Sequence, residues 1–389
     1  MHRAIILLSL FGACTRPPSL EGKAGAPPDT TYRLGIAPGV VHDSTDAHIA
    51  ATLQGFLRTK DGDTRSPYWK PEDFEAYVHP YADLLHIEAG WNGPRTYRPT
   101  LAAIAPTERA DQRVAKLAFL GADSSGILQL RALFDVLVTV TPERVTLERM
   151  LARNTRTWTE RTVGTLVYRF PPGIAFDAAA AQEEEAFNQR VAAFFGSDTL
   201  PFTYYVCVDP EQVFRIRGFE HWPLMYAART GGQNETWSNT VYAGNGAFRY
   251  DHELVHSYAV RAAGGGMHLL LEEGICTLLG GSNEKPFAHH RAALAAFMAA
   301  HPDERFAMHL DPAVHLDLDG GTSVAYAVGG LLCERALRLG GRERLFDLFR
   351  SSNDEDGLWK AMALIGLSPT SIDAELRAEL QRPFTLRVP

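Results

Sequence analysis

The sequence contains few cysteines, no excess of positive charge and no long apolar run beyond its first residues. Only 4 of its 389 residues are cysteine, and no two of them form a Cys-x-x-Cys pair. This scarcity argues against a metal site built on thiolates and against a fold held by disulfides. A formal net charge of −8 argues against nucleic-acid binding through a basic surface. Because a membrane-spanning helix needs about 20 consecutive apolar residues, a protein with several spans is excluded as well.

The composition is that of a chain that folds. Hydrophobic residues make up 46% of the sequence and charged residues 22%. Globular proteins have this balance, so a mostly disordered protein is excluded. A chain of 389 residues is too long for one ordinary domain, and two or three domains are expected.

The first 13 residues have the composition of a secretory signal, because His2 and Arg3 precede a short apolar run and then small residues. The segment Gly12-Ala13-Cys14 resembles the lipobox of bacterial lipoproteins. The resemblance implies that residues 1–13 are removed, that Cys14 is lipidated, and that the protein is anchored in the bacterial cell envelope, where we expect the outer membrane. Residues 14–32 contain four prolines and are expected to form a tether. A plain signal peptide with an incidental cysteine is the alternative.

Residues 33–153 begin with a helical pattern and continue with strand-like runs. Apolar residues on one face predict a helix over 46–58. Strands are expected in four runs: 84–87, 114–120, 133–140 and 145–151. A helix followed by a meander of strands predicts a small α+β module. The module faintly resembles the cone-shaped nuclear-transport-factor fold.

Residues 154–389 change from a mixed to a helical pattern. Strands are expected at 163–170 and 202–208, with an amphipathic helix at 176–195 between them. From residue 246 the pattern is helical and is interrupted by glycine clusters, which are typical of helix ends. The expectation is a small mixed sheet followed by a mainly helical part, so the fold class of the whole chain is α+β.

A histidine pair in residues 250–258 is the most informative motif. His252 and His256 are four residues apart, so on a helix they share one face about one turn from each other. Two neutral imidazoles at this separation can bind one zinc ion. Glu253 stands beside the first histidine, where its carboxylate can act as a general base rather than as a ligand. The sequence therefore predicts a catalytic zinc site.

A carboxylate pair downstream offers the third ligand that a catalytic zinc site requires. Glu272 and Glu273 lie inside the apolar run 269–276, where burying them is costly unless something compensates their charge. Because successive helical residues point about 100° apart, only one of the two is expected to reach the metal. A solvated face that carries both carboxylates is the alternative.

His-Glu-x-x-His followed by a helix with Glu-Gly resembles the gluzincin metallopeptidases, in particular their compact bacterial type, similar to peptidase MA. In the aminopeptidase-like branch, the ligand is the glutamate immediately before the glycine. The resemblance therefore implies that Glu273, before Gly274, completes the zinc site with His252 and His256. It also implies that Tyr326, in Tyr-x-x-Gly, donates a hydrogen bond to the oxyanion during catalysis. A packed aromatic residue is the alternative for Tyr326.

These features lead to an expected function and to two alternatives. The expectation is zinc-dependent hydrolysis of peptide bonds in the cell envelope, with Glu253 as the base, a peptide or protein as substrate, and no nucleic-acid partner. The Gly-Ala-Met-Glu-Asn motif is missing, which argues against strict aminopeptidase activity. One alternative is a non-catalytic envelope lipoprotein with a structural zinc site and a partner-binding N-terminal module, against which Glu253 counts. The other is a zinc hydrolase that acts on something other than peptides.

Three further expectations concern residues around this site. The strand-like residues 239–243 are expected to line the cleft and to pair with an extended peptide. A disulfide between Cys276 and Cys333 is conceivable, because both are expected on helices near the site. His289 and His290 are adjacent, and we assign them to a solvated helix from which they point apart.

Overall fold

The computed structural model describes residues 32–62, 65–90, 93–264, 266–312, 316–350 and 354–385. Helices and sheets are both well represented among them, and the fold is α+β, as predicted. The residues group into two compact units. The N-terminal unit contains the described residues up to Thr159 together with Asp209–Arg229, and the C-terminal unit contains Glu160–Val208 and the described residues from Thr230 onward. The expected signal peptide, Cys14 and nearly all of the expected tether lie outside the described residues.

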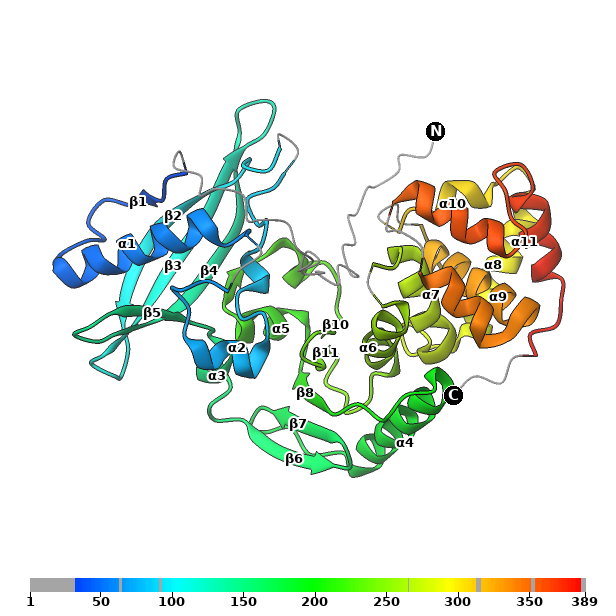
Figure 1. Cartoon of the computed structure of the whole chain (residues 1–389), viewed down its shortest axis with the longest axis horizontal. Helices are drawn as coiled ribbons and strands as arrows, with labels where there is room; N and C mark the ends of the chain where they lie inside the picture. Colours follow the sequence, from blue (N-terminus) through cyan, green and yellow to red (C-terminus); the bar gives the residue numbers. More distant parts are fainter. Residues whose placement is uncertain are drawn as a thin grey trace. The chain divides into compact units, whose positions relative to one another are not determined.

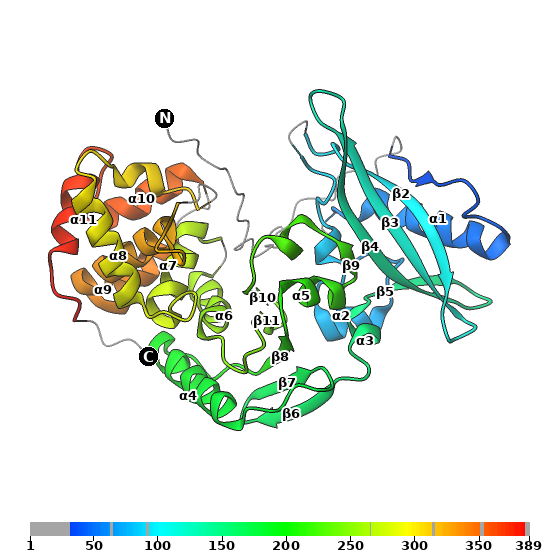
Figure 2. The ribbon, with the colours of Figure 1, turned by 180° about the vertical axis from the view of Figure 1, so that it is seen from behind.

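A sheet forms the body of the N-terminal unit. Its strands run in the order β1 (Gly35–Ile36), β2 (Arg98–Pro106), β3 (Gln112–Ala122), β4 (Leu128–Val140) and β5 (Val145–Glu148). From β2 to β5 the pairing is antiparallel, as expected for a meander. Helix α1 (Ser44–Thr59) lies across one face of the sheet, in front of it in Figure 1 and behind it in Figure 2. Its apolar side chains enter the core of this unit.

The predicted strand at 84–87 is wrong. The chain there passes through a 3-10 turn, η1 (Ala82–Leu84), and continues without strand pairing through His86, which has a φ of 53°. The turn buries Leu84 and Ile87 in the core. A short apolar run is compatible with any buried conformation, so the sequence pattern could not distinguish this turn from a strand.

A segment from the second half of the chain completes the N-terminal unit. Helix α5 (Pro210–Arg217) leads into β9 (Phe219–His221), which pairs with β4. Gly218 joins the two at a φ of 113°, and a Cβ there would lie 2.7 Å from the carbonyl oxygen of Asp135. Only glycine fits both the conformation and this close approach.

A mixed sheet opens the C-terminal unit. Its strands run in the order β10 (Gly231–Glu235), β11 (Thr240–Gly244), β8 (Phe202–Cys207), β7 (Leu166–Phe170) and β6 (Thr159–Val163). Strands β11, β8 and β7 are parallel, whereas β10 runs antiparallel to β11. The predicted strand at 239–243 is therefore β11, but it lies inside the sheet. The edge strand on that side is β10.

Helices make up the rest of the C-terminal unit. They are α4 (Ala178–Phe195), α6 (Asp251–Ala263), α7 (Leu269–Gly280), α8 (Phe287–Ala300), α9 (Val324–Phe349), α10 (Glu355–Leu364) and α11 (Ile372–Leu380). Helix α7 packs against both α6 and α9 (Figure 1). In the part of the chain that the structure describes, no helix combines the length and the apolar character needed to cross a membrane.

Two glycines allow α7 and α9 to pack closely. A Cβ on Gly274 would lie 2.3 Å from the carbonyl carbon of Gly329, and a Cβ on Gly329 would lie 2.2 Å from the carbonyl oxygen of Leu270. Neither position can carry a side chain without separating the helices. The glycine after Glu273 and the glycine three residues after Tyr326 therefore meet each other, which brings the two motifs together.

Candidate metal centre

Helices α6 and α7 bring five polar side chains together in the interior of the C-terminal unit. Helix α6 contributes His252 and His256, and α7 contributes Glu272, Glu273 and Cys276; all five are at most 7% exposed. The histidines face α7 because they lie one turn apart on the same side of α6. The carboxylates are buried, so the solvated-face alternative is wrong.

A glycine lets the end of α7 approach the first turn of α6. A Cβ on Gly280 would lie 2.6 Å from the backbone nitrogen of His252. The next residue, Gly281, has a φ of 75° and ends α7. Its carbonyl oxygen accepts a hydrogen bond of 2.7 Å from Nδ1 of His252. The glycines after α7 thus fix the orientation of the first histidine.

The Nε2 atoms of both histidines lie near one carboxylate oxygen. Oε2 of Glu273 is 3.2 Å from Nε2 of His252 and 3.9 Å from Nε2 of His256. The two Nδ1 atoms have other partners: the Gly281 carbonyl for His252 and Oε1 of Glu272, at 3.0 Å, for His256. Partners of this kind hold imidazole rings in place around metals. Glu272 is therefore in position to orient His256, and Glu273 to share a ligand site with both histidines.

The second oxygen of Glu273 is an unsatisfied buried group. Oε1 has no hydrogen-bond partner within the described residues, and the side chain is only 1% exposed. A buried carboxylate oxygen without a partner destabilises the fold unless something compensates it. A bound cation supplies that compensation, so the residues present fit a metal ion.

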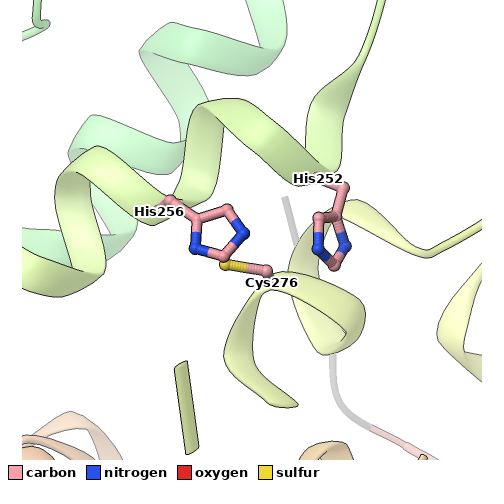
Figure 3. A group of neighbouring side chains, drawn as sticks. All are labelled: His252, His256 and Cys276. Carbon is pink, nitrogen blue, oxygen red and sulfur yellow. The ribbon is translucent and has the colours of Figure 1, made fainter. Parts of the chain in front are cut away.

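Cys276 also belongs to this cluster. Ligand atoms of His252, His256 and Cys276 lie within 4.8 Å of one another, and this buried group can hold a metal ion. Figure 3 shows the two imidazole rings with a nitrogen of each facing the other, and the cysteine sulfur beside the ring of His256. From the sequence, Cys276 was considered only for a disulfide with Cys333 and was not predicted as a metal ligand. The available signal was its spacing, three residues after Glu273 on the same helix.

A metal ion that binds Cys276 would have to displace the proton of its buried thiol. Burial raises the pKa of the Cys276 thiol to about 12, and only the thiolate binds metals well. The conceivable disulfide to Cys333 is absent, since Cys276, Cys333 and Cys207 are all buried and form no disulfide.

Glu253 lies between the histidines and the edge strand β10. It is 7% exposed, and burial is the main cause that raises its pKa, while His256 and His252 oppose the rise. A Cβ on Gly232, in β10, would lie 2.9 Å from Cγ of Glu253 and 2.3 Å from Cε1 of Tyr250. The absence of a side chain on Gly232 therefore lets the edge strand contact the helix at Glu253.

Tyr326 lies at the start of α9, next to the first histidine. Its ring is nearly parallel to that of His252, at a centroid distance of 6.2 Å and an interplanar angle of 12°. Ser323 caps α9 by accepting a hydrogen bond from the backbone nitrogen of Tyr326. The cap and the glycine contact one turn later fix the position of this tyrosine.

The structure thus groups all five residues that the sequence singled out for zinc binding and catalysis, and adds Glu272 as a partner of His256 and Cys276 as a neighbour.

No protein-family model matches this sequence, and a search of curated proteins finds no match either. The case for a function therefore depends on the residues of this centre and their geometry.

Proposed function

We propose that this protein is a zinc-dependent peptidase. The observation that carries the proposal is the convergence of two imidazole Nε2 atoms on the carboxylate of Glu273, which has one unsatisfied oxygen, in a buried site. Two histidines and one carboxylate are a ligand set typical of catalytic zinc, which leaves one position open. We favour Glu273 over Cys276 as the third ligand because its Oε2 lies near both Nε2 atoms and its Oε1 has no hydrogen-bond partner among the described residues.

The residues around the ion divide the chemistry among them. Zinc bound here would polarise the scissile carbonyl and lower the pKa of a water molecule to about 7. Glu253 accepts a proton from the attacking water and passes it to the leaving amine. Tyr326 donates a hydrogen bond to the oxyanion of the tetrahedral intermediate. Glu272 and the Gly281 carbonyl keep the two imidazoles oriented.

An extended peptide would bind along β10. This strand is the edge of the sheet and contacts the helix that carries Glu253. Edge strands bind peptides through main-chain hydrogen bonds, and Gly231 and Gly232 have no side chain to obstruct an approaching chain. This assignment replaces the expected role of residues 239–243, because β11 already has a neighbour on each side.

The main alternative is a structural metal site in a non-catalytic protein. Glu253 counts against it, because a structural site does not need a buried carboxylate beside its ligands, and burying one is costly. Strict aminopeptidase activity remains disfavoured for lack of the sequence motif that binds a free amine.

The test uses the zinc-loaded full chain and a pool of peptides of mixed sequence. The wild type should hydrolyse peptides. Glu253→Gln, which keeps the size of the side chain but cannot accept a proton, should bind zinc normally and lose about 10²–10⁴-fold in rate. Equal rates for the two proteins, or a wild type that holds zinc and cleaves nothing, would contradict the proposal.

We also propose that Cys14 anchors the protein to a membrane of the bacterial cell envelope. The support is the sequence alone, namely a short apolar run that ends in Gly12-Ala13-Cys14. Cys14→Ser should abolish lipid labelling and release the protein from membranes or leave it uncleaved. Unchanged fractionation with membranes would show that Cys14 is not the anchor.

A further inference from the structure

A cavity of about 550 Å³ opens beside His252 in the C-terminal unit. Its lining includes Arg249–His252, at the start of α6. It also includes residues 280–287, between α7 and α8, and Thr230, just before β10. His252, a proposed zinc ligand, is part of this lining, so the cavity reaches the metal centre at that residue.

The loop in the cavity wall contains a turn in an unfavourable conformation. Ser282 and Lys285 pair as an isolated bridge, and the two residues between them, Asn283 and Glu284, have φ values of 48° and 60°. Turns with two left-handed central residues favour Asn-Gly. Glutamate at the second position costs free energy that glycine would avoid.

Neighbouring residues hold this turn in place. His290 is 1% exposed, so its assignment to a solvated helix face is wrong. Its Nε2 lies 2.9 Å from the carbonyl oxygen of Ser282 and 3.1 Å from that of Lys285. Nδ2 of Asn283 donates a hydrogen bond of 2.7 Å to the carbonyl oxygen of Gly321. The turn is therefore tied to α8 and to the loop before α9, and Glu284 has a fixed place at the cavity.

Glu284 differs from the other charged residues of the cavity because it lacks a partner. Arg249 pairs with Asp251 at 2.7 Å, and Lys285 lies 3.7 Å from Asp319. Glu284 is exposed and makes no ion pair or hydrogen bond with any residue that the structure describes.

Glu284 lines the same cavity as Tyr250 and the proposed zinc ligand His252.

We propose, on the basis of the peptidase function above, that Glu284 binds a positively charged group of the substrate and makes the enzyme selective for it. The group is a lysine or arginine side chain, because strict aminopeptidase activity is disfavoured, and acetylated peptides test whether a free α-ammonium group is bound instead. A carboxylate without a partner, in the cavity that His252 also lines, can form a charge-assisted hydrogen bond with such a cation. This role explains why glutamate occupies a turn position that favours glycine.

The experiment compares zinc-loaded full-length proteins on quenched fluorescent peptides that differ at one position. That position carries Lys, Arg, Gln or Glu, and each peptide is made with a free and with an acetylated N-terminus. The wild type should cleave the cationic peptides with a kcat/KM about tenfold above that of the Gln peptides. Glu284→Gln should reduce this preference to within about twofold, mainly through KM, and Glu284→Lys should favour the Glu peptides.

Controls separate selectivity from folding and from the proposed function. Glu343→Gln removes an exposed acid of α9 and should keep the wild-type preference, and zinc content and Tm show whether each variant folds. If acetylation of the N-terminus abolishes the preference, the group that Glu284 binds is the α-ammonium group. If the preference depends on Lys or Arg at the varied position, the group is that side chain. Active wild type without a cation preference, or a preference that survives Glu284→Gln, overturns this inference alone. A wild type that holds zinc and cleaves no peptide overturns the proposed function, and the inference with it.

Discussion

Neighbouring glutamates on α7 occupy different positions around the histidines. Glu273 approaches both Nε2 atoms, whereas Glu272 accepts a hydrogen bond at Nδ1 of His256. The resemblance implied Glu273 as the ligand, because it is the glutamate immediately before the glycine, whereas helix geometry alone left the choice between the two glutamates open. The role of Glu272 could not be inferred from the sequence, since a hydrogen bond to a ring nitrogen has no sequence signature.

The first prediction concerns zinc affinity, measured by competition with a chelator. His252→Ala and Glu273→Ala should lower it most, because each removes a ligand. Glu272→Ala should lower it much less, by about 10–100-fold, because it removes only an orienting partner. Cys276→Ser should stay near the wild type. A larger loss for Glu272→Ala than for Glu273→Ala would mean that the other glutamate is the ligand, and a large loss for Cys276→Ser would make the thiol the third ligand.

The second prediction concerns the hydroxyl of Tyr326. Tyr326→Phe keeps the ring that stacks on His252, so folding and zinc content should be unchanged. If the hydroxyl stabilises the oxyanion, kcat should fall by about 10²–10³ with little change in KM. If the residue is only a packed aromatic, steady-state kinetics will give a kcat within a few fold of the wild type.

At the scale of elements, the helices around the site were more predictable than the edge strand. The pattern of α6 and α7 combines helical spacing with glycine at the ends, and such signals are local. Strand β10, with the sequence Gly-Gly-Gln-Asn-Glu, has neither alternation nor β-branched residues. It is a strand because β11 offers a hydrogen-bonding edge beside it. Pairing of this kind depends on the fold, so the cleft was assigned to the neighbouring strand from sequence alone.

The third prediction concerns a buried acid in α4. Glu184 is fully buried, and burial, together with the charge of Asp251, raises its pKa well above the ordinary value. Because the folded pKa is the higher one, the neutral acid stabilises the fold below the ordinary pKa of about 4.3. That contribution is lost as the pH rises through the folded pKa. Glu184→Gln should therefore gain in stability relative to the wild type as the pH rises from 4.5 to 8. A difference in Tm between the two proteins that stays constant over this range would contradict the prediction.

At the scale of the whole molecule, the α+β class followed from the sequence, whereas the path of the chain between the units did not. Residues 209–229 stand in the middle of a segment that reads as one domain, yet Phe214 and Phe219 belong to the core of the N-terminal unit. Nothing in the local sequence pattern shows that the chain returns to the N-terminal unit here, because apolar residues in a helix and a strand can pack into any core. Chain order alone therefore does not delimit the units.

The last prediction follows from the separate cores of the two units. Each hydrophobic cluster consists of residues from one unit only, and every proposed zinc ligand lies in the C-terminal unit. Calorimetry of the zinc-loaded protein should resolve two unfolding transitions. A chelator should lower the Tm of one of them, because free zinc at 100 times its Kd stabilises the folded state by about 2.7 kcal/mol.

Core substitutions identify the two transitions. Leu53→Ala removes a fully buried side chain of the N-terminal unit and should cost about 2–5 kcal/mol. This substitution should lower only the Tm of the transition that the chelator does not shift. Leu271→Ala removes an equally buried side chain of the C-terminal unit. It should lower only the Tm of the transition that the chelator also lowers. A single transition that both substitutions and the chelator shift together would mean that the two cores unfold as one, despite their separate packing.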